Sequence, residues 1–237
     1  HVWLNVAADP LFTASYTGGN AGMVIAVADE PGMHSSQNEQ DSRHYAKAAK
    51  MLMLEPSDSE ECLEYAKAAY ELSEKFDTPV ILRLTTRVAH SRSIVNIGER
   101  NDIGVKDYVK NPGKYVMMPA MAKKRHIVVE DRMVAEREWA ETASINTVEY
   151  NDKKIGVISS GICYQYAKEA LGDRVSYLKL GCVNPLPIEL IKNFAANCDK
   201  VYVLEELDPF IEEHCKQIGI DVIGKDAFTL QGEYSQN

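Results

Sequence analysis

Apolar and polar positions alternate along the first part of this chain with the spacing of short strands and amphipathic helices. The segments predicted as strands are 23–28, 51–54 and 80–84, and those predicted as helices are 4–16, 44–50 and 57–76. This strand–helix–strand–helix–strand order is typical of a parallel sheet with right-handed crossovers. Pro10 marks either the first turn of its helix or a kink. Ser57 and Glu60 predict a capping box at the helix start.

The same alternation resumes at Lys154 and predicts a second unit. The strands predicted there are 155–158, 175–180, 201–204 and 221–223. A helix is predicted after each of the first three strands: the first ends at about Leu171, and the other two cover 188–197 and 210–218. Such regularity indicates a doubly wound or Rossmann-like arrangement. Between the two units, the pattern fades and then predicts a charged connecting helix over 120–144. We therefore expect an α/β protein with two open, mostly parallel sheets and flanking helices.

Three short motifs in the second unit have a structural interpretation. The turn 159–161, Ser-Ser-Gly, could hold an anion at a helix N-terminus, but a structural cap is the more common use of such residues. The segment 181–187 predicts a rigid crossover turn. Glu205 and Glu206 are adjacent on a strand and point to opposite faces, so they cannot form an acid/base pair unless the chain bends.

A dense polar loop, Pro31–Arg43, follows the first predicted strand. In open α/β sheets, ligands bind outside the carboxyl ends of the strands, and this loop lies at such an end. The alternative is a solvated turn in which Ser35 or Ser36 caps the next helix. Within this loop, His34 is a candidate for proton transfer or substrate binding, because imidazole is the usual side chain for proton transfer near neutral pH.

Arg87 ends another strand of the same sheet, directly after Thr85 and Thr86. The carboxyl ends of parallel strands meet at one edge, so Arg87 is expected at the edge that carries the His34 loop. A guanidinium there could bind a carboxylate through two parallel hydrogen bonds. The alternative is an ordinary surface arginine.

Charge and length exclude several classes of function. The net charge of the 237 residues is -9, which argues against nucleic acid as a partner because phosphate binding needs a basic face. No apolar run approaches the roughly 20 residues that cross a membrane, and no signal peptide is visible. We therefore expect neither a nucleic-acid nor a membrane partner.

The five cysteines are widely spaced and form no close pair. Iron–sulfur clusters need four thiolates at short spacings, and zinc ligands usually come in close pairs. The sequence therefore predicts no metal site, and the cysteines suit small buried positions in a reducing, cytoplasmic compartment.

Two long motifs carry a resemblance to a known family. The first extends from 4–10, Leu-Asn-Val-Ala-Ala-Asp-Pro, through 34–41, His-Ser-Ser-Gln-Asn-Glu-Gln-Asp. The second combines 155–161, 178–181, 185–187 and 203–207. In this order they resemble the alpha subunits of indolepyruvate:ferredoxin oxidoreductases, a branch of the thiamine-diphosphate-dependent 2-oxoacid:ferredoxin oxidoreductases. The resemblance covers nearly the whole chain and implies an internal fragment of such a subunit.

The resemblance implies a division of the chain into parts. Residues 1–92 correspond to the C-terminal part of a thiamine-pyrimidine-binding domain, and 93–145 to a linker with a connecting helix. Residues 146–230 correspond to a transketolase-C-terminal-like domain, and 231–237 to an exit linker. It also assigns Glu205 and Glu206 to domain packing.

The family reaction oxidatively decarboxylates aryl 2-oxoacids such as indolepyruvate to aryl-acetyl-CoA, with coenzyme A and ferredoxin. The resemblance implies thiamine diphosphate, Mg²⁺ and 4Fe-4S clusters in the full-length enzyme, where thiamine acts as an electron sink. The thiamine-activating glutamate and the cluster-binding domain are expected outside this chain. On that basis the chain alone is expected to hold no cofactor and to be inactive. The implied partners are the beta subunit, ferredoxin, the 2-oxoacid and coenzyme A, and an uncovered sheet edge predicts a homo-oligomer.

The resemblance also supplies candidate site residues. In thiamine enzymes of the transketolase type, the loop at this position carries a histidine that faces the substrate pocket. The candidate catalytic residue is therefore His34, and the candidate substrate-binding residues are Asn5, Ser35, Ser36, Gln37 and Arg87.

Two other classes of function stay open. One is a beta-type subunit of a thiamine-dependent transketolase or 2-oxoacid dehydrogenase, which shares both domains but does not use ferredoxin. The other is a non-catalytic assembly module that binds no ligand. The iron content of the full-length protein would separate the first alternative from the oxidoreductase.

Overall fold

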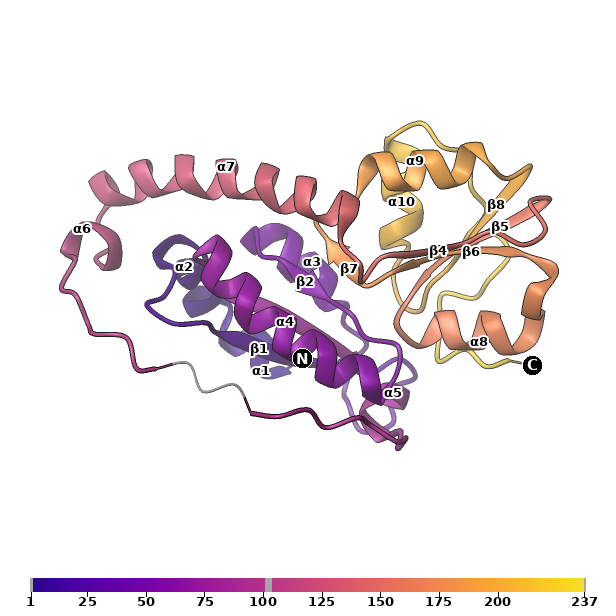
Figure 1. Ribbon diagram of the computed structural model, residues 1–237, viewed down its shortest axis with the longest axis horizontal. Coiled ribbons are helices and arrows are strands. Elements are labelled where there is room, and N and C mark those ends of the chain that lie inside the picture. The colour runs from indigo at the N-terminus through magenta and orange to yellow at the C-terminus, as the bar shows by residue number, and fades with distance from the viewer. Residues whose placement is uncertain (1, 101–103, 237) are drawn as a thin grey trace.

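The computed structural model describes residues 2–100 and 104–236. Residues 1, 101–103 and 237 lie outside the described residues. They fall inside the predicted ranges 1–92, 93–145 and 231–237, respectively. The described chain forms two α/β lobes (Figure 1). The elements of the first lobe are α1 (Val2–Val6), α2 (Ala8–Thr17), β1 (Val24–Asp29), α3 (Ser42–Ala49), β2 (Met53–Leu54), α4 (Ser59–Phe76), β3 (Val80–Thr85) and α5 (Thr86–His90). The predicted helix 4–16 is thus two helices, and Pro10 lies in the first turn of α2, where its missing N–H leaves no bond unmade.

The connecting segment contains α6 (Pro112–Tyr115) and the long helix α7 (Pro119–Thr142), which runs along one side of the first lobe to the second lobe (Figure 1). The second lobe contains β4 (Thr147–Glu149), β5 (Ile155–Ser160), α8 (Gly161–Leu171), the 3₁₀ turn η1 (Gly172–Arg174), β6 (Ser176–Leu180), β7 (Cys182–Asn184), α9 (Ile188–Ala196), β8 (Lys200–Leu204) and α10 (Phe210–Gln217). The predicted α/β class with two mostly parallel sheets is confirmed. Among the described residues, no helix is long and apolar enough to span a membrane.

The first sheet has the strand order β1-β3-β2-β7. β3 pairs in parallel with β1 and with β2, so that Val80 faces Val24 and Leu82 faces Leu54. β2 is fully buried because helices cover both of its faces, which explains its continuous apolar sequence. The carboxyl ends of the three parallel strands lie at one edge.

β7 corrects the prediction of a crossover turn over 181–187. This segment leaves the second lobe after β6 and pairs antiparallel with β2 of the first sheet. The Glu55 N–H donates to the Gly181 carbonyl at 2.8 Å, and Asn184 Nδ2 donates to the Met51 carbonyl at 2.7 Å. A Cβ at Gly181 would lie 2.4 Å from the Ile145 carbonyl oxygen, so this strand entry needs glycine.

The second sheet has the order β4-β6-β5-β8, with β4 antiparallel to its neighbour. α9 and α10 pack on one face of this sheet, while α8 packs on the other. The sequence pattern missed β4, whose three residues are too short to show alternation. The predicted strand 221–223 is represented by a single bridge between Tyr202 and Ile223.

The start of α4 lies one residue later than predicted. Asp58, not Ser57, is the N-cap, and its carboxylate accepts the Glu61 N–H at 2.9 Å. Glu61 in turn accepts the Ser57 N–H at 2.8 Å. The capping bond from the N-cap side chain is therefore present, with Asp58 in place of Ser57, while Glu61 reaches back to the residue before the cap.

A buried charge network joins the two lobes. Arg43 Nε donates to Asp41 Oδ1 at 2.9 Å, and its Nη1 donates to Glu205 Oε2 of the second lobe at 2.5 Å. Arg83 donates to Asp29 Oδ2 at 2.7 Å and to Glu55 Oε1 at 2.5 Å. All six side chains of this network are buried, namely those of Asp29, Asp41, Arg43, Glu55, Arg83 and Glu205. The two arginines thus stabilise four carboxylates.

Glu55 and Glu205 connect this network to helix N-termini of the second lobe. Glu205 accepts the backbone N–H groups of Ile211 and Glu212 in the first turn of α10, each at 3.0 Å. Glu55 accepts the Ser160 hydroxyl at 3.2 Å, and a Cβ at Gly161 would lie 2.5 Å from its Oε1. Gly161 also has a φ of 51°, so its position requires glycine on both grounds. The anion at the turn 159–161 is therefore the protein's own Glu55.

We expect Arg43→Met to lower the free energy of unfolding by about 3–5 kcal/mol, because the substitution removes the cation that the buried carboxylates Asp41 and Glu205 both bind. Urea denaturation at neutral pH measures this change. Arg92→Met is the matched control, since Arg92 is exposed. A loss no greater than that of the control would show that the network does not hold the lobes together.

Glu136 of α7 is fully buried beside Arg132, with 3.5 Å between Oε1 and the arginine Nε. Burial raises the pKa of Glu136 to about 8, although Arg132 opposes this shift. The folded protein therefore retains a proton that the unfolded chain loses above about pH 4.5. Stability should fall as the pH rises from there to about 8, with a slope of at most about 1.4 kcal/mol per pH unit.

In Glu136→Gln, we expect this slope to flatten and the protein to be more stable than the wild type at pH 8. Urea denaturation between pH 5 and 9 measures the difference. Parallel pH profiles for the two proteins would contradict the expectation.

Candidate functional site

The candidate site lies at the carboxyl edge of β1 and β3, in the loop 30–41 and the start of α5. The same charge network holds both ends of the loop. Asp29 Oδ2 accepts the N–H of Ser42 at 2.9 Å and its hydroxyl at 2.8 Å, and also binds Arg83. Asp41, at the other end, binds Arg43. Residues 30–41 therefore form a compact loop whose ends are close together, a type of loop that often carries function.

His34 and Arg87 contact the same carboxylate oxygen. The sequence predicted that the His34 loop and the strand end at Arg87 would lie at one edge of the sheet. His34 Nε2 lies 2.9 Å from Glu233 Oε2. Arg87 Nε and Nη2 lie 3.0 and 2.5 Å from the same oxygen. The side chains of His34 and Arg87 are 49% and 56% exposed, and that of Glu233 is 11% exposed. The hydrogen bond from Arg87 to Glu233 raises the pKa of the arginine.

Ser35 and Ser36 bind the loop's own Glu30. The backbone N–H and the hydroxyl of Ser35 donate to Glu30 Oε1 at 2.9 and 3.0 Å. Hydrogen bonds from Ser36 and Ser35 lower the pKa of Glu30. The two serines thus fix the shape of the loop next to His34. Neither is the cap of α3, because that cap is Asp41.

Asn5 and Gln37 lie apart from the pair of His34 and Arg87. Asn5 Nδ2 donates to Gln40 Oε1 at 2.7 Å, and Asn5 Oδ1 accepts the Tyr45 hydroxyl. Asn5 therefore contacts the far end of the loop and α3. Gln37 is an exposed residue of the loop. The structure brings two of the six predicted site residues onto one carboxylate and places the other four around the loop.

Sequence reasoning missed the segment that supplies Glu233. Residues 229–236, here called the strap, fold back over the second lobe toward the loop. The Gly232 N–H donates to Glu39 Oε1 at 3.3 Å, and the Tyr234 N–H donates to Glu206 Oε1 at 2.9 Å. The Gly32 N–H also donates to Glu39 Oε1, at 2.8 Å. A short polar segment without periodicity gives no signal for such contacts.

Glu206 is a buried carboxyl beneath the strap. Burial raises its pKa to about 7, while the hydrogen bond from Tyr234 and the charge of Arg83 oppose this shift. The carboxylates of Glu233 and Glu55 raise the pKa further. The candidate site therefore contains a carboxyl group that titrates near neutral pH within the lobe interface.

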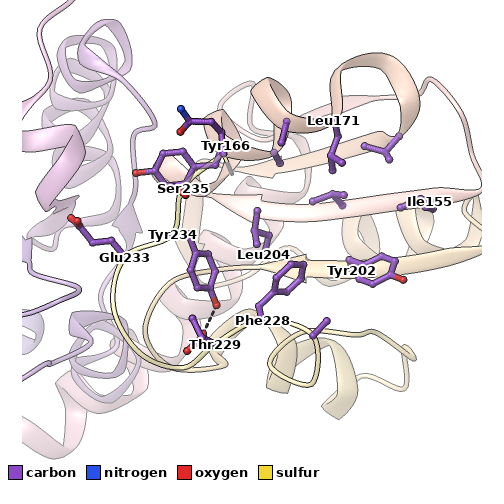
Figure 2. A pocket seen from close by; sticks show the side chains of 16 residues that line it. Ile155, Tyr166, Leu171, Tyr202, Leu204, Phe228, Thr229, Glu233, Tyr234 and Ser235 are labelled. Atoms are coloured by element: carbon purple, nitrogen blue, oxygen red, sulfur yellow. Dashed lines mark hydrogen bonds between the residues drawn. The ribbon is translucent and has the colours of Figure 1, made fainter.

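The strap also covers an apolar cavity of about 650 Å³ on the second sheet. Figure 2 shows Glu233 extended toward the first lobe, Tyr202 and Leu204 on the sheet, and Phe228 and Tyr234 on the segment after α10. Side chains of β5, β8 and α8 supply half of the lining, and the segment 227–236 supplies most of the rest. The only charged residue among the lining is Glu233, so the cavity has no cation for a phosphate group.

The described residues do not fit a metal ion or a diphosphate at the carboxyl edge. Asp41, His44 and Asp208 are close enough to share a metal ion. However, both oxygens of Asp41 bind Arg43, and His44 Nε2 lies 2.9 Å from Asp208 Oδ2. The buried arginines at this edge are engaged by carboxylates, so an added diphosphate would meet excess negative charge.

The chain is similar to known proteins along nearly its whole length. The chain is 41% identical to the indolepyruvate oxidoreductase subunit IorA of Archaeoglobus fulgidus over 231 residues, which is 95% of this chain and 37% of the relative. The subunit IorA of Methanothermobacter thermautotrophicus is 41% identical and matches 100% of this chain with 40% of its own length. The chain is a relative of the indolepyruvate oxidoreductase subunit IorA.

The subunit IorA of Pyrococcus horikoshii is also 41% identical, over 95% of this chain and 38% of its own length. The chain thus spans about 37–40% of the length of these IorA relatives. The resemblance inferred from the two long motifs is confirmed. The chain matches no protein-family model.

Solved structures share the fold at low sequence identity. A 2-oxoglutarate:ferredoxin oxidoreductase from Magnetococcus marinus, solved with 2-oxoglutarate, coenzyme A and succinyl-CoA bound, matches 100% of this chain and 50% of its own with a TM-score of 0.72 and 15% identity. A split-gene transketolase, described as an inactive beta4 tetramer, matches 94% of this chain and 63% of its own with a TM-score of 0.54 and 18% identity. These structures support the two-lobed α/β arrangement.

Proposed function

We propose that this chain forms part of the alpha subunit of an enzyme that oxidatively decarboxylates aryl 2-oxoacids, such as indolepyruvate, to aryl-acetyl-CoA with ferredoxin as electron acceptor. The observation that carries the proposal is the convergence of His34 and Arg87 on one carboxylate at the carboxyl edge of the first sheet. The IorA relatives, 41% identical along nearly the whole chain, give the class of substrate.

In this proposal, Arg87 binds the substrate carboxylate, and His34 holds or moves a proton beside it. Glu233 occupies the same position within the chain, so a substrate carboxylate has to displace it. Ser35 and Ser36 keep the loop in shape through Glu30, and Gln37 lies on the exposed side of the loop for contact with substrate.

The cofactors are proposed to lie outside this chain. Thiamine diphosphate with Mg²⁺ and the 4Fe-4S clusters belong to the rest of the full-length enzyme, because the carboxyl edge described here is acidic. We propose the beta subunit, ferredoxin, coenzyme A and a further copy of the chain as partners, in the cytoplasm. We propose domain boundaries at 92, 145 and 230. Asn5 is proposed to belong to the substrate-contacting segment, through its contact with the loop.

The alternative with a specific observation in its favour is a transketolase-type beta subunit, since the split-gene transketolase shares the fold. This alternative predicts a full-length enzyme without iron and without ferredoxin reduction. Iron analysis of the full-length protein, with reduction of ferredoxin or viologen by arylpyruvates, decides between the two.

We expect His34→Ala to lower the turnover number of the intact enzyme by about 10²–10⁴-fold, the usual contribution of a positioned acid/base group. Steady-state ferredoxin or viologen reduction with arylpyruvates measures this change. His126→Ala is the matched control, because its side chain is also 49% exposed and lies on α7. Wild-type turnover in the His34 variant would contradict this role and indicate that the loop is a solvated turn.

We expect Arg87→Ala to raise KM with nearly unchanged kcat, because a carboxylate is bound alike in the ground and transition states. The effect should be larger for aryl 2-oxoacids than for aldehydes without the carboxylate. Glu233→Gln should lower KM by up to about fivefold, since it removes a carboxylate that competes with substrate for a partly exposed arginine. In the Arg87→Ala background, Glu233→Gln should have no further effect.

The same assay with Glu169→Gln provides the control, since Glu169 is an exposed carboxylate of α8. A Glu233→Gln enzyme with wild-type or higher KM would show that Glu233 does not compete with substrate. An Arg87→Ala enzyme with wild-type KM would contradict the role of Arg87.

A further inference from the structure

A second, basic cavity lies where three helices meet, away from the candidate site. It has a volume of about 220 Å³ and lies between α3, α7, α10 and the segment after β7. The charged and titratable residues of its lining are Lys47, Lys50, Glu130, Arg137 and His214. Helices from both lobes and the connecting helix therefore bring three permanent cations and one carboxylate together in a chain whose net charge is -9.

Two of these cations have no carboxylate partner in the part of the chain that the structure describes. Lys50 Nζ lies 2.9 Å from Glu130 Oε1, so this pair is neutral. Within residues 2–100 and 104–236, neither Lys47 nor Arg137 has a carboxylate within salt-bridge distance. Lys47 Nζ lies 5.5 Å from the centroid of the Phe210 ring, which holds the ammonium group at the cavity.

The charges of the two unpaired cations reach His214, which lines the same cavity. Its Nε2 is buried and has no hydrogen-bond partner in the described part of the chain. Burial, together with the charges of Lys47 and Arg137, lowers the pKa of His214 to about 4. Lys50 and Glu130 line the same space and offset each other. The imidazole is therefore neutral at physiological pH, and its buried Nε2 has a hydrogen-bonding capacity that no described residue uses.

We propose that this cavity binds a phosphate-sized oxyanion between Lys47 and Arg137, with His214 as a third, neutral contact. An oxyanion would supply the negative charge that the two cations lack, and guanidinium and ammonium groups are the usual partners of phosphate oxygens. The volume is below that of sites for drug-sized ligands, so it suits a free ion or the terminal phosphate of a ligand that extends into solvent. The site is independent of the proposed oxidoreductase activity.

The test is isothermal titration calorimetry of the intact subunit at low ionic strength, with inorganic phosphate in one arm and glycerol 3-phosphate in the other. Lys47→Met and Arg137→Met should each weaken binding about tenfold or more, because each removes a charge-assisted hydrogen bond. Lys123→Met, which removes an exposed cation of α7 outside the cavity, should bind as the wild type does. Glu130→Gln should strengthen binding, because it removes the only carboxylate of the lining.

Stronger binding of glycerol 3-phosphate than of phosphate identifies a phosphorylated ligand as the source, while the reverse identifies the free ion. Thermal denaturation of each variant without ligand verifies folding, and a variant that fails this check is replaced by Lys47→Gln or Arg137→Gln. No binding of either compound at millimolar concentration would overturn the proposal. Equal binding by the wild type and both cavity variants would also overturn it.

Discussion

Two buried arginines fix the arrangement of this protein. Arg43 and Arg83 hold four buried carboxylates, and one of these, Glu205, belongs to the other lobe. A buried carboxylate is costly without a cationic partner, so the two lobes cannot separate without exposing or neutralising these groups. The interface is thus specified by charge pairing as well as by apolar packing. Glu205 also accepts backbone N–H groups at the start of α10, which stabilises that helix directly.

The network also sets the geometry of the candidate site. Asp29 and Asp41 close the ends of the loop that carries His34, and both are bound by the arginines. Glu206 follows Glu205 in sequence and holds the strap through Tyr234. The loop, the strap and the lobe interface are therefore mechanically coupled, although no catalytic candidate belongs to the network itself. A change in Arg43 would move the loop as well as weaken the interface.

The sequence predicted those features that depend on local periodicity. The apolar runs of β1 and β3 and the amphipathic α4 follow directly from side-chain spacing, and parallel pairing places His34 and Arg87 at one edge. Two other features depend on contacts distant in sequence. Cys182–Asn184 is a strand only because β2 offers it an edge, and its flanking glycine and proline are typical of a turn. Glu233 lies in a polar segment that is positioned by hydrogen bonds to Glu39 and Glu206. No spacing of apolar or polar residues along the sequence indicates these contacts.

Because of the strand β7, a gene segment that encodes one lobe alone does not encode a complete sheet. Its three residues belong by sequence to the second lobe, yet they complete the sheet of the first lobe. A gene segment that encoded only residues before β4 would produce a first sheet with β2 exposed at its edge. A segment that encoded only the later residues would carry a buried strand with nothing to pair with. Recombination between relatives can therefore exchange the two lobes together, but exchange of one lobe alone requires a matching β2 and β7.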